Sequence, residues 1–266
     1  MPLYLIPTPI GNYEDITLRA VETLKNVDLV LCEDTRITGL LLSRLGIKNH
    51  LKCYQEFNEI EVSQYAIKLL KENKSIALVS DAGTPLLSDP GYVIVKEAIK
   101  ENIEIISLPG PSAFLTALVK SGVSLNHFYF HGFLSAKAEQ REKELKSLTS
   151  IKTTLVFYEA PHRLLKMLED LLLVFGDQEI VVARELTKKH ETFYRGLISS
   201  LLDTITLKGE FVVIVPYRKK ETEGSIKELY DEALKETKNE KLAMKKVASL
   251  KNISKSEVYK EIEKYK

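Results

Sequence analysis

Two turn-rich loops carry the groups that could hold and align a small charged molecule. The first spans Val79–Gly91 and reads VSDAGTPLLSDPG, and the second is PGPSA at 109–113. Gly83 has no Cβ, so the backbone there can turn sharply and approach a ligand, while Pro85 stiffens the chain that follows. Asp81 is the charged group at the tip of the first loop. We expect both loops to line one binding crevice.

The kind of ligand is limited by what the loops lack. The chain has no G-x-G-x-x-G and no G-x-x-x-x-G-K-[ST] motif, so we do not expect the ligand to be held by its phosphates. Asp-Gly and Pro-Gly pairs are also ordinary turn chemistry, and either loop alone could be purely structural.

Four further polar clusters follow predicted strands. They read TPIGN at 8–12, EDTR at 33–36, YEAPHR at 158–163 and RELTKKHE at 184–191. In an open α/β sheet, ligands bind outside the carboxyl ends of the strands. The clusters therefore predict a cleft that is lined from both halves of the chain.

Short apolar strands alternate with amphipathic helices from the start of the chain to residue 121. This alternation is typical of a mostly parallel sheet with helices on both faces, so we expect a doubly wound α/β domain over residues 1–121. Its strands are predicted at Leu3–Ile6, Leu29–Cys32, Leu51–Tyr54, Ser75–Val79 and Glu104–Ser107, and its helices at Thr17–Asn26, Thr38–Leu45, Glu61–Glu72, Tyr92–Glu101 and Ser112–Ser121.

Wider strand candidates follow in residues 122–217, which we expect to form a second α/β domain around a mixed sheet. The predicted strands are Phe128–Phe133, Thr153–Tyr158, Ile180–Arg184, Phe193–Gly196 and Phe211–Pro216, and the predicted helices are Ala138–Ser147, Arg163–Phe175 and Ile198–Thr204. A single sheet holding the strands of both halves is the alternative, although it would exceed the usual size of one core.

The last part, residues 225–266, is predicted to be a small helical extension. A charge-rich connector at 218–224 precedes helices at Ile226–Glu236, Glu240–Leu250 and Ser254–Lys264, with Ser254 as an N-cap. Residues 218–266 hold 14 Lys and Arg against 10 Asp and Glu, whereas the rest of the chain holds 24 against 27. This helix-turn-helix-like extension either contacts nucleic acid or presents a solvated basic face.

The composition is that of a globular protein, with 44% hydrophobic and 28% charged residues. No apolar run approaches the ~18 residues of a membrane span, and no basic leader precedes Leu3–Ile6, so we expect neither a membrane anchor nor a signal peptide. Cys32 and Cys53 form no C-x-x-C pair, so we expect no disulfide framework and no metal site. A cytoplasmic location fits these features.

The six motifs TPIGN, EDTR, SDAGTPLLSDPG, PGPSA, YEAPHR and RELTKKHE occur in the order typical of one family. On them, the chain resembles the ribosomal RNA small subunit methyltransferase I family, in the tetrapyrrole methylase superfamily of S-adenosylmethionine (AdoMet) enzymes. The resemblance covers residues 3–216 almost without a break.

The resemblance implies two α/β domains that form a deep cleft, a homodimer, and AdoMet bound in a folded shape between the domains. It also implies methyl transfer to the 2′-hydroxyl of a cytidine in 16S rRNA of the small ribosomal subunit. The AdoMet contacts that it implies are Pro9, Gly11, Asp81, Ala82, Gly83, Thr84, Pro109, Pro111, Ser112 and Ala113, together with His131, Gly132, Glu159 and Glu210 by strand position.

Methyl transfer from a sulfonium needs alignment of the oxygen, the methyl carbon and the sulfur more than a strong electrostatic trap. A base that accepts the hydroxyl proton would help, because a ribose hydroxyl is a weak acid. The candidates are Glu33, Asp34, Glu56, Glu159, Glu185 and Glu191, and Lys188 if burial or a cationic neighbour lowers its pKa. We hypothesise that Glu33 or Glu191 approaches the hydroxyl.

Basic residues in the same motifs are candidates for rRNA phosphates, namely Arg36, Arg163, Arg184 and Lys188. The alternative for EDTR and RELTKKHE is a structural network of ion pairs across the domain interface. His162 and His190 have no paired nucleophile or metal cluster, so we assign them no catalytic role. An aromatic residue near the cleft could stack on a flipped cytosine, with candidates Tyr54, Phe57, Tyr158, Phe193 and Tyr194.

Two other functions are compatible with the sequence. The first is an AdoMet enzyme that methylates a tetrapyrrole such as a corrin precursor, because fold and cofactor alone do not separate the two substrates. The second is a non-catalytic RNA-binding protein that senses AdoMet.

Overall fold

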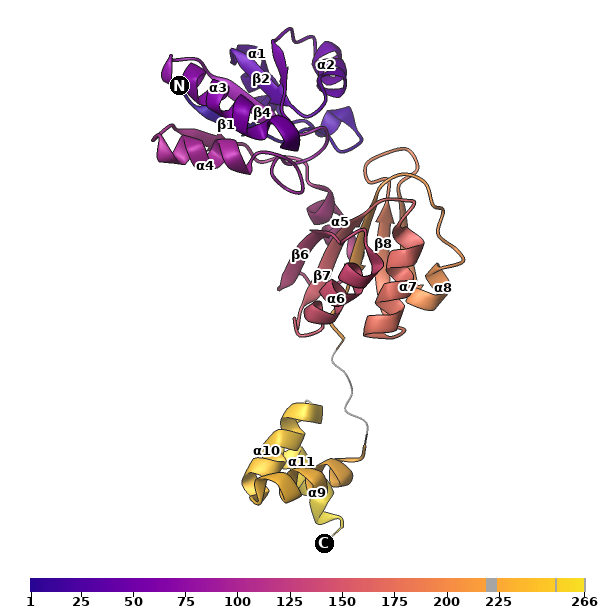
Figure 1. The fold of residues 1–266 in the computed structure, drawn as a ribbon. Helices are drawn as coiled ribbons and strands as arrows, with labels where there is room; N and C mark the ends of the chain where they lie inside the picture. Colours follow the sequence, from indigo (N-terminus) through magenta and orange to yellow (C-terminus); the bar gives the residue numbers. More distant parts are fainter. Residues whose placement is uncertain (219–223, 252, 266) are drawn as a thin grey trace. The chain divides into compact units, whose positions relative to one another are not determined.

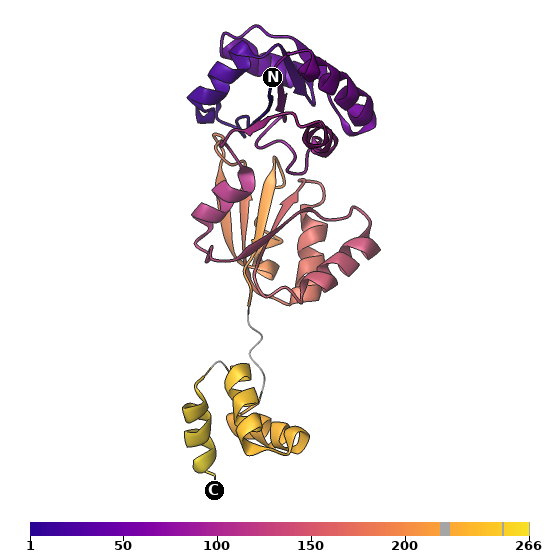
Figure 2. The ribbon, with the colours of Figure 1, turned by 90° about the vertical axis from the view of Figure 1, so that its left-hand side faces the viewer.

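The computed structural model describes residues 1–218, 224–251 and 253–265. The chain divides into two compact units, residues 1–217 and residues 218–266. Figures 1 and 2 show that the larger unit contains two separate sheets, each covered by helices. The alternative of one large sheet is therefore wrong.

The first sheet is parallel throughout, with the strand order β3-β2-β4-β1-β5. Every residue of the central strands β2 and β4 is buried, as expected for strands covered on both faces. Helices α1 and α2 pack on one face and helices α3 and α4 on the other. The elements are β1 (Leu3–Ile6), α1 (Leu18–Asn26), β2 (Leu29–Cys32), α2 (Thr35–Arg44), β3 (Leu51–Cys53), α3 (Glu59–Lys71), β4 (Ile76–Val79), α4 (Tyr92–Lys100) and β5 (Ile105–Ser107), with short 3-10 helices at Tyr13–Asp15 and Glu56–Asn58.

The second sheet has the strand order β6-β7-β10-β8-β9 and confirms the predicted mixed sheet. Only its β6–β7 pair is parallel among the strands described. Its elements are β6 (Phe128–Phe133), α6 (Ala138–Leu148), β7 (Thr154–Glu159), α7 (Leu164–Phe175), β8 (Glu179–Arg184), β9 (Thr192–Leu197), α8 (Ile198–Leu201) and β10 (Phe211–Val215). Helices α6, α7 and α8 cover one face.

Helix α5 (Ala113–Ser121) covers the other face of the second sheet, although it follows the last strand of the first sheet. Its buried Ala117 and Leu118 pack with Val156 of β7 and Ile214 of β10. Figure 1 shows α5 beside β6, β7 and β8. The division between two domains at residues 121 and 122 stays a prediction, and α5 is the element on which its placement depends.

The predicted strands and helices of the larger unit are present, with shifted ends. Helix α2 begins at Thr35, three residues before the prediction, because the Asp34 side chain accepts a hydrogen bond from the Arg36 amide and caps the helix there. Helix α8 ends at Leu201 rather than Thr204. The short strand expected at Phe193–Gly196 is the middle of β9.

The smaller unit contains three helices in its described part, α9 (Ile226–Thr237), α10 (Glu240–Lys251) and α11 (Lys255–Glu263). Ser254 is the N-cap of α11, as predicted, and it forms a capping box with Glu257. The side chains of Leu229, Val247 and Val258, one from each helix, share a small core. Positions 219–223 of the predicted connector, Asn252 of the predicted turn and Lys266 lie outside the described residues. Among the helices described, none has the length and hydropathy that a bilayer crossing requires.

Candidate active site

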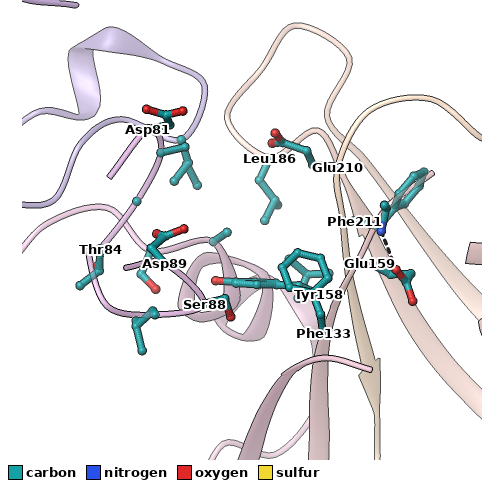
Figure 3. A pocket seen from close by; sticks show the side chains of 18 of the residues that line it. Asp81, Thr84, Ser88, Asp89, Phe133, Tyr158, Glu159, Leu186, Glu210 and Phe211 are labelled. Atoms are coloured by element: carbon teal, nitrogen blue, oxygen red, sulfur yellow. Dashed lines mark hydrogen bonds between the residues drawn. The ribbon is translucent and has the colours of Figure 1, made fainter. Parts of the chain in front are cut away.

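A cavity of about 310 Å³ lies in the larger unit, between the carboxyl-end loops of the first sheet and the second sheet. Figure 3 shows Asp81, Thr84, Ser88 and Asp89 on one side of it, facing Tyr158 and Leu186 on the other. The walls combine apolar side chains with a few polar ones, as is common in small-molecule sites. The lining residues are Ile10, Asp81, Ala82, Gly83, Thr84, Leu87, Ser88, Asp89, Ser112, Ala113, Phe133, Tyr158, Glu159, Ala160, Pro161, Leu186, Glu210, Phe211 and Val212.

The loops after β1, β4 and β5 are tied together by hydrogen bonds behind the cavity. The amide of Thr8 donates to the carbonyl of Gly83 at 2.8 Å, and the amide of Gly83 donates back at 3.0 Å. The Thr84 hydroxyl donates to the carbonyl of Pro111 at 3.0 Å. Gly83 has φ +85°, a conformation that favours glycine. This cross-linking holds the loops in place before any ligand binds.

Eight of the fourteen predicted AdoMet contacts line the cavity, and they come from four different segments. They are Asp81, Ala82, Gly83, Thr84, Ser112, Ala113, Glu159 and Glu210. The structure therefore brings together residues that are more than a hundred positions apart in the sequence.

The other six predicted contacts lie outside this lining. Gly11 packs against the segment 186–188, where an added Cβ would come within 2.8 Å of the Leu186 carbonyl oxygen. The carbonyl of Pro111 accepts the Thr84 hydrogen bond, and Gly132 faces the Ser88 hydroxyl. His131 is half-buried, with its Nε2 3.9 Å from a Glu144 carboxylate oxygen. Pro9 is half-buried and Pro109 is exposed.

Two buried polar atoms in the lining have no hydrogen-bond partner among the described residues, the Ser112 Oγ and the Glu159 Oε2. Glu159 is 2% exposed, and burial raises the pKa of its carboxyl despite hydrogen bonding from the Ala160 amide and the nearby Arg163 charge. Buried polar atoms without partners are costly, and at a cavity wall they mark the points at which a bound ligand would be held. Beside the apolar walls, they fit a ligand such as AdoMet, which is part apolar and part charged.

Three carboxylates, Glu33, Asp81 and Asp89, form what we call the acidic cluster. Burial raises the pKa of each, and the negative charge of a neighbouring carboxylate adds to it. Burial, with the nearby charges of Glu33 and Asp81, raises the pKa of Asp89 to about 7. No Lys or Arg forms an ion pair with these three carboxylates within the described ranges. Asp34 lies just outside the cluster, and its hydrogen bonds with Arg36 lower its pKa to about 2.

A second group, which we call the paired cluster, consists of two lysines and their carboxylate partners: Lys120 with Glu191, and Lys188 with Glu185 and Glu210. Lys188 Nζ lies 2.9 Å from Glu185 Oε1 and 3.0 Å from Glu210 Oε2, and Lys120 Nζ lies 2.5 Å from Glu191 Oε1. The Lys120 hydrogen bond lowers the pKa of Glu191. Burial acts to lower the pKa of Lys188, but the bonds to Glu185 and Glu210 outweigh it and raise that pKa.

These pairings weigh against two of the three predicted catalytic roles. A lysine with a raised pKa keeps its proton at neutral pH, so Lys188 does not meet the condition that a base role requires. Glu191 accepts hydrogen bonds from both Lys120 and the Thr187 amide, at 2.5 and 2.7 Å, which makes it a weak base. Glu33 has a raised pKa and is the predicted candidate whose surroundings suit proton transfer.

The predicted RNA-binding arginines differ in their exposure and in the partners that their side chains already have. The side chain of Arg36 is 89% exposed, although it bonds with Asp34. Arg163 lies 3.2 Å from Glu159 Oε1 and donates to the Leu134 carbonyl at 2.5 Å. Arg184 donates to the carbonyls of Lys208 and His190. In this structure, Arg163 and Arg184 hold the second sheet and its loops together.

Sequence reasoning missed Asp89 and underrated Tyr158. Asp89 lies in the turn-rich loop 79–91, in its Ser-Asp-Pro-Gly turn, but a turn aspartate is usually a local hydrogen-bond acceptor. Tyr158 lines the cavity, whereas Tyr54, another aromatic candidate, is buried with its hydroxyl bonded to Glu59 and Ser63. Two sequence features could have identified Asp89 as a site residue: the many turn residues around it and its closeness in sequence to Asp81.

Comparison with known proteins gives one consistent group of relatives. Residues 2–202 match the family described as Tetrapyrrole (Corrin/Porphyrin) Methylases. A protein of Bacillus subtilis (strain 168) named Ribosomal RNA small subunit methyltransferase I is 42% identical over 97% of this chain and 92% of its own. A protein of the same name from Thermotoga maritima is 45% identical over 80% of this chain and 97% of its own.

Among solved structures, the crystal structure of uroporphyrin-III-C-methyltransferase from Thermus thermophilus has the same fold. It aligns with a TM-score of 0.57 and 21% identity, over 80% of this chain and 93% of that chain. At this identity the likeness speaks for the fold alone. It supports the architecture of two sheets covered by helices.

Proposed function

This chain belongs to the ribosomal RNA small subunit methyltransferase I family, within the tetrapyrrole methylases, and from that premise we propose that it methylates the ribose 2′-hydroxyl of a cytidine in 16S rRNA. The observation that carries the proposal is the cavity, which is lined by loops of both sheets and contains buried polar atoms that lack partners. AdoMet is the methyl donor, and when bound it supplies a methyl group on a positively charged sulfur.

The residues that would hold AdoMet come from both sheets. Asp81 is suited to the ammonium group, because a carboxylate accepts charge-assisted hydrogen bonds. The Ser112 hydroxyl and the Glu159 carboxylate offer the two partnerless buried atoms to the polar parts of the ligand. Gly83 allows the backbone to come close, and Leu186 and Phe211 supply apolar contact. Six further residues outside the lining, Pro9, Gly11, Pro109, Pro111, His131 and Gly132, are also proposed as AdoMet contacts.

The rRNA is proposed to approach at the ends of β2 and β3. The Gln55 side chain donates to the carbonyl of Glu33 at 3.0 Å, which joins the two strand-end segments. From this edge project Arg36, which is suited to a phosphate, and Phe57, which is 83% exposed and suited to stacking on a base. The cytidine 2′-hydroxyl would then reach the cavity on the side of the acidic cluster.

We also propose that the protein works as a homodimer in the cytoplasm, where ribosomal subunits mature. Four apolar side chains are exposed on helix α5 and on β6, which is an edge strand of the second sheet. They are Leu115, Val119, Phe128 and Tyr129, which are 39–68% exposed. Such a surface favours association. Sedimentation analysis of the wild type and of Val119→Glu tests the dimer, since the added charge should shift the protein to monomer.

The experiment that tests the function uses small ribosomal subunits that lack the modification. They are incubated with the protein and AdoMet labelled in its methyl group, and the labelled nucleotide is then mapped. Label on the ribose of one cytidine supports the proposal. A parallel incubation offers a corrin precursor in place of the subunits. Label in that tetrapyrrole and none in RNA would support the corrin alternative, and binding of AdoMet without transfer to either would support a non-catalytic sensor.

A further inference from the structure

The loop from Thr84 to Gly91 is held in an unusual conformation that presents its aspartate to the cavity. Leu86 and Ser88 both adopt left-handed backbone conformations, with φ +72° and +68°. Such conformations are costly for residues other than glycine and gather at functional sites. Asp89, which lines the cavity, comes directly after the second of them. Figure 3 shows its carboxylate between the Asp81 loop and Tyr158.

The neighbours of Asp89 come from three elements around it. Glu33 at the end of β2 and Asp81 at the end of β4 are negative. Burial raises the pKa of the Tyr158 hydroxyl on β7, and the negative charge of nearby Asp89 adds to that rise. Tyr158 is held in place, because its hydroxyl accepts a hydrogen bond from the Phe114 amide at 3.2 Å. Negative neighbours without a cation make a carboxylate more basic than it is in water.

We propose that Asp89 is the catalytic base that accepts the proton of the attacking 2′-hydroxyl; this rests on the function proposed above. The hydroxyl oxygen forms a bond to the methyl carbon as the carbon–sulfur bond breaks, and the electron pair of that bond stays on the sulfur, which becomes a neutral thioether. The hydroxyl proton passes to the Asp89 carboxylate and later to water. Burial and Glu33 keep Asp89 basic, and Asp81 adds to this in the protein without AdoMet, before its own charge pairs with the AdoMet ammonium.

The other carboxylates are less suited to this step. Glu159 is buried beside Arg163, and Glu185 and Glu191 are bonded to lysines. Asp34 caps α2 and holds Arg36, so it is ionised well below neutral pH. A general base works best when its pKa is near the operating pH. Asp89 meets that condition, since burial and its negative neighbours raise its pKa to about 7.

The test is single-turnover methylation of small subunits by Asp89→Asn, measured from pH 5.5 to 9. The wild-type rate should rise with pH and level off above about 7, because the carboxylate must be ionised. Asp89→Asn should be slower by about 10²- to 10⁴-fold, without that inflection. Its AdoMet affinity should stay within about threefold of the wild type. Asp203→Asn, the same change at an exposed site away from the cavity, is the matched control.

A second variant keeps the test valid if Asp89→Asn does not fold. Glu33→Gln retains Asp89 but removes a negative neighbour, so the inflection in the rate should move to lower pH. Rates of Asp89→Asn close to the wild type, or a loss confined to AdoMet affinity, would overturn the role of Asp89. Absence of methyl transfer to RNA by the wild type would instead overturn the proposed function itself.

Discussion

The acidic cluster and the paired cluster contain the same kind of group, carboxylates in the loops around the cavity, but in opposite electrostatic surroundings. Glu33, Asp81 and Asp89 have negative neighbours, which add to the effect of burial and raise their pKa values. Glu185 and Glu191 have lysine partners, and their pKa values are lowered. The residue type therefore does not decide whether a carboxylate is a base or a structural anion. Its neighbours do.

The largest expected effect is on the methylation rate, which should depend on the acidic cluster and hardly on the paired cluster. Glu191→Gln should change the single-turnover rate by less than about threefold, against the loss of at least about a hundredfold expected for Asp89→Asn. The reason is that the Glu191 carboxylate already accepts hydrogen bonds from the Lys120 ammonium and the Thr187 amide. Parallel rate measurements on both variants check this, and a Glu191→Gln rate as low as that of Asp89→Asn would erase the distinction.

The next effect is on stability as a function of pH. The pKa of Asp89 rises from about 3.9 in the unfolded chain to about 7 in the fold. Between these values the folded state binds more protons than the unfolded one, so stability falls as pH rises from about 4 to about 7. Asp89→Asn avoids this loss and should be more stable than the wild type at pH 8 by about 1–3 kcal/mol.

Urea unfolding at pH 4 and pH 8 measures that difference. At pH 4 the Asp89 carboxyl is protonated in the folded state, and the advantage of Asp89→Asn should vanish. A variant that is less stable than the wild type at pH 8 would mean that the carboxylate is stabilised by a partner rather than strained by its neighbours.

A third prediction concerns Gly11, where the first sheet's loop touches the paired cluster. An added Cβ would lie 2.4 Å from Lys188 Cγ and 2.8 Å from the Leu186 carbonyl, so Gly11→Ala should cost about 1–3 kcal/mol by overpacking. Gly39→Ala is the matched control, since the nearest atom to its Cβ is 3.7 Å away and the residue lies inside α2. Thermal unfolding of both variants and of the wild type measures this cost. If Gly11→Ala melts at the same temperature as the wild type, the neighbouring atoms can move aside without cost.

The smallest effect is the stability that the paired cluster itself contributes. Glu191→Gln should destabilise the fold by about 1 kcal/mol at pH 7, because its partly exposed bond to Lys120 is lost. The pKa of Glu191 is lowered in the fold, so this contribution is present above its unfolded value and fades as pH falls. Unfolding at pH 7 and pH 3, with the exposed Glu169→Gln as control, measures it. If the difference in unfolding free energy between Glu191→Gln and the wild type were the same at both pH values, the ion pair with Lys120 would be excluded as its cause.

Much of the fold could be predicted from the sequence because its elements are strongly patterned. The strands Leu29–Cys32 and Ile76–Val79 read as unbroken apolar runs, which is what a strand buried on both faces requires. The start of α2 was placed too late, since the capping role of Asp34 was not considered. The packing of α5 on the second sheet could not be predicted, because an apolar helix face does not say which sheet it will cover.

The site was predictable in its loops and less so in its charges. Asp81, Gly83 and Ser112 were found from turn chemistry and family resemblance, and they line the cavity. Asp89 was missed because its raised pKa depends on burial and on the charges of Glu33 and Asp81, and these surroundings are known only once the chain is folded. The pairing of Glu191 with Lys120, which are 71 positions apart, was hidden for the same reason.

The position of α5 in the chain has a consequence for how the protein is made. Synthesis delivers α5 before any strand of the sheet that it covers, and β10, which carries its contact Ile214, is the last of those strands. Until β10 emerges, Ala117 and Leu118 have no completed surface to bury against. A nascent chain stalled in this interval should attract chaperones and proteases, and release from them should coincide with translation of the last strand.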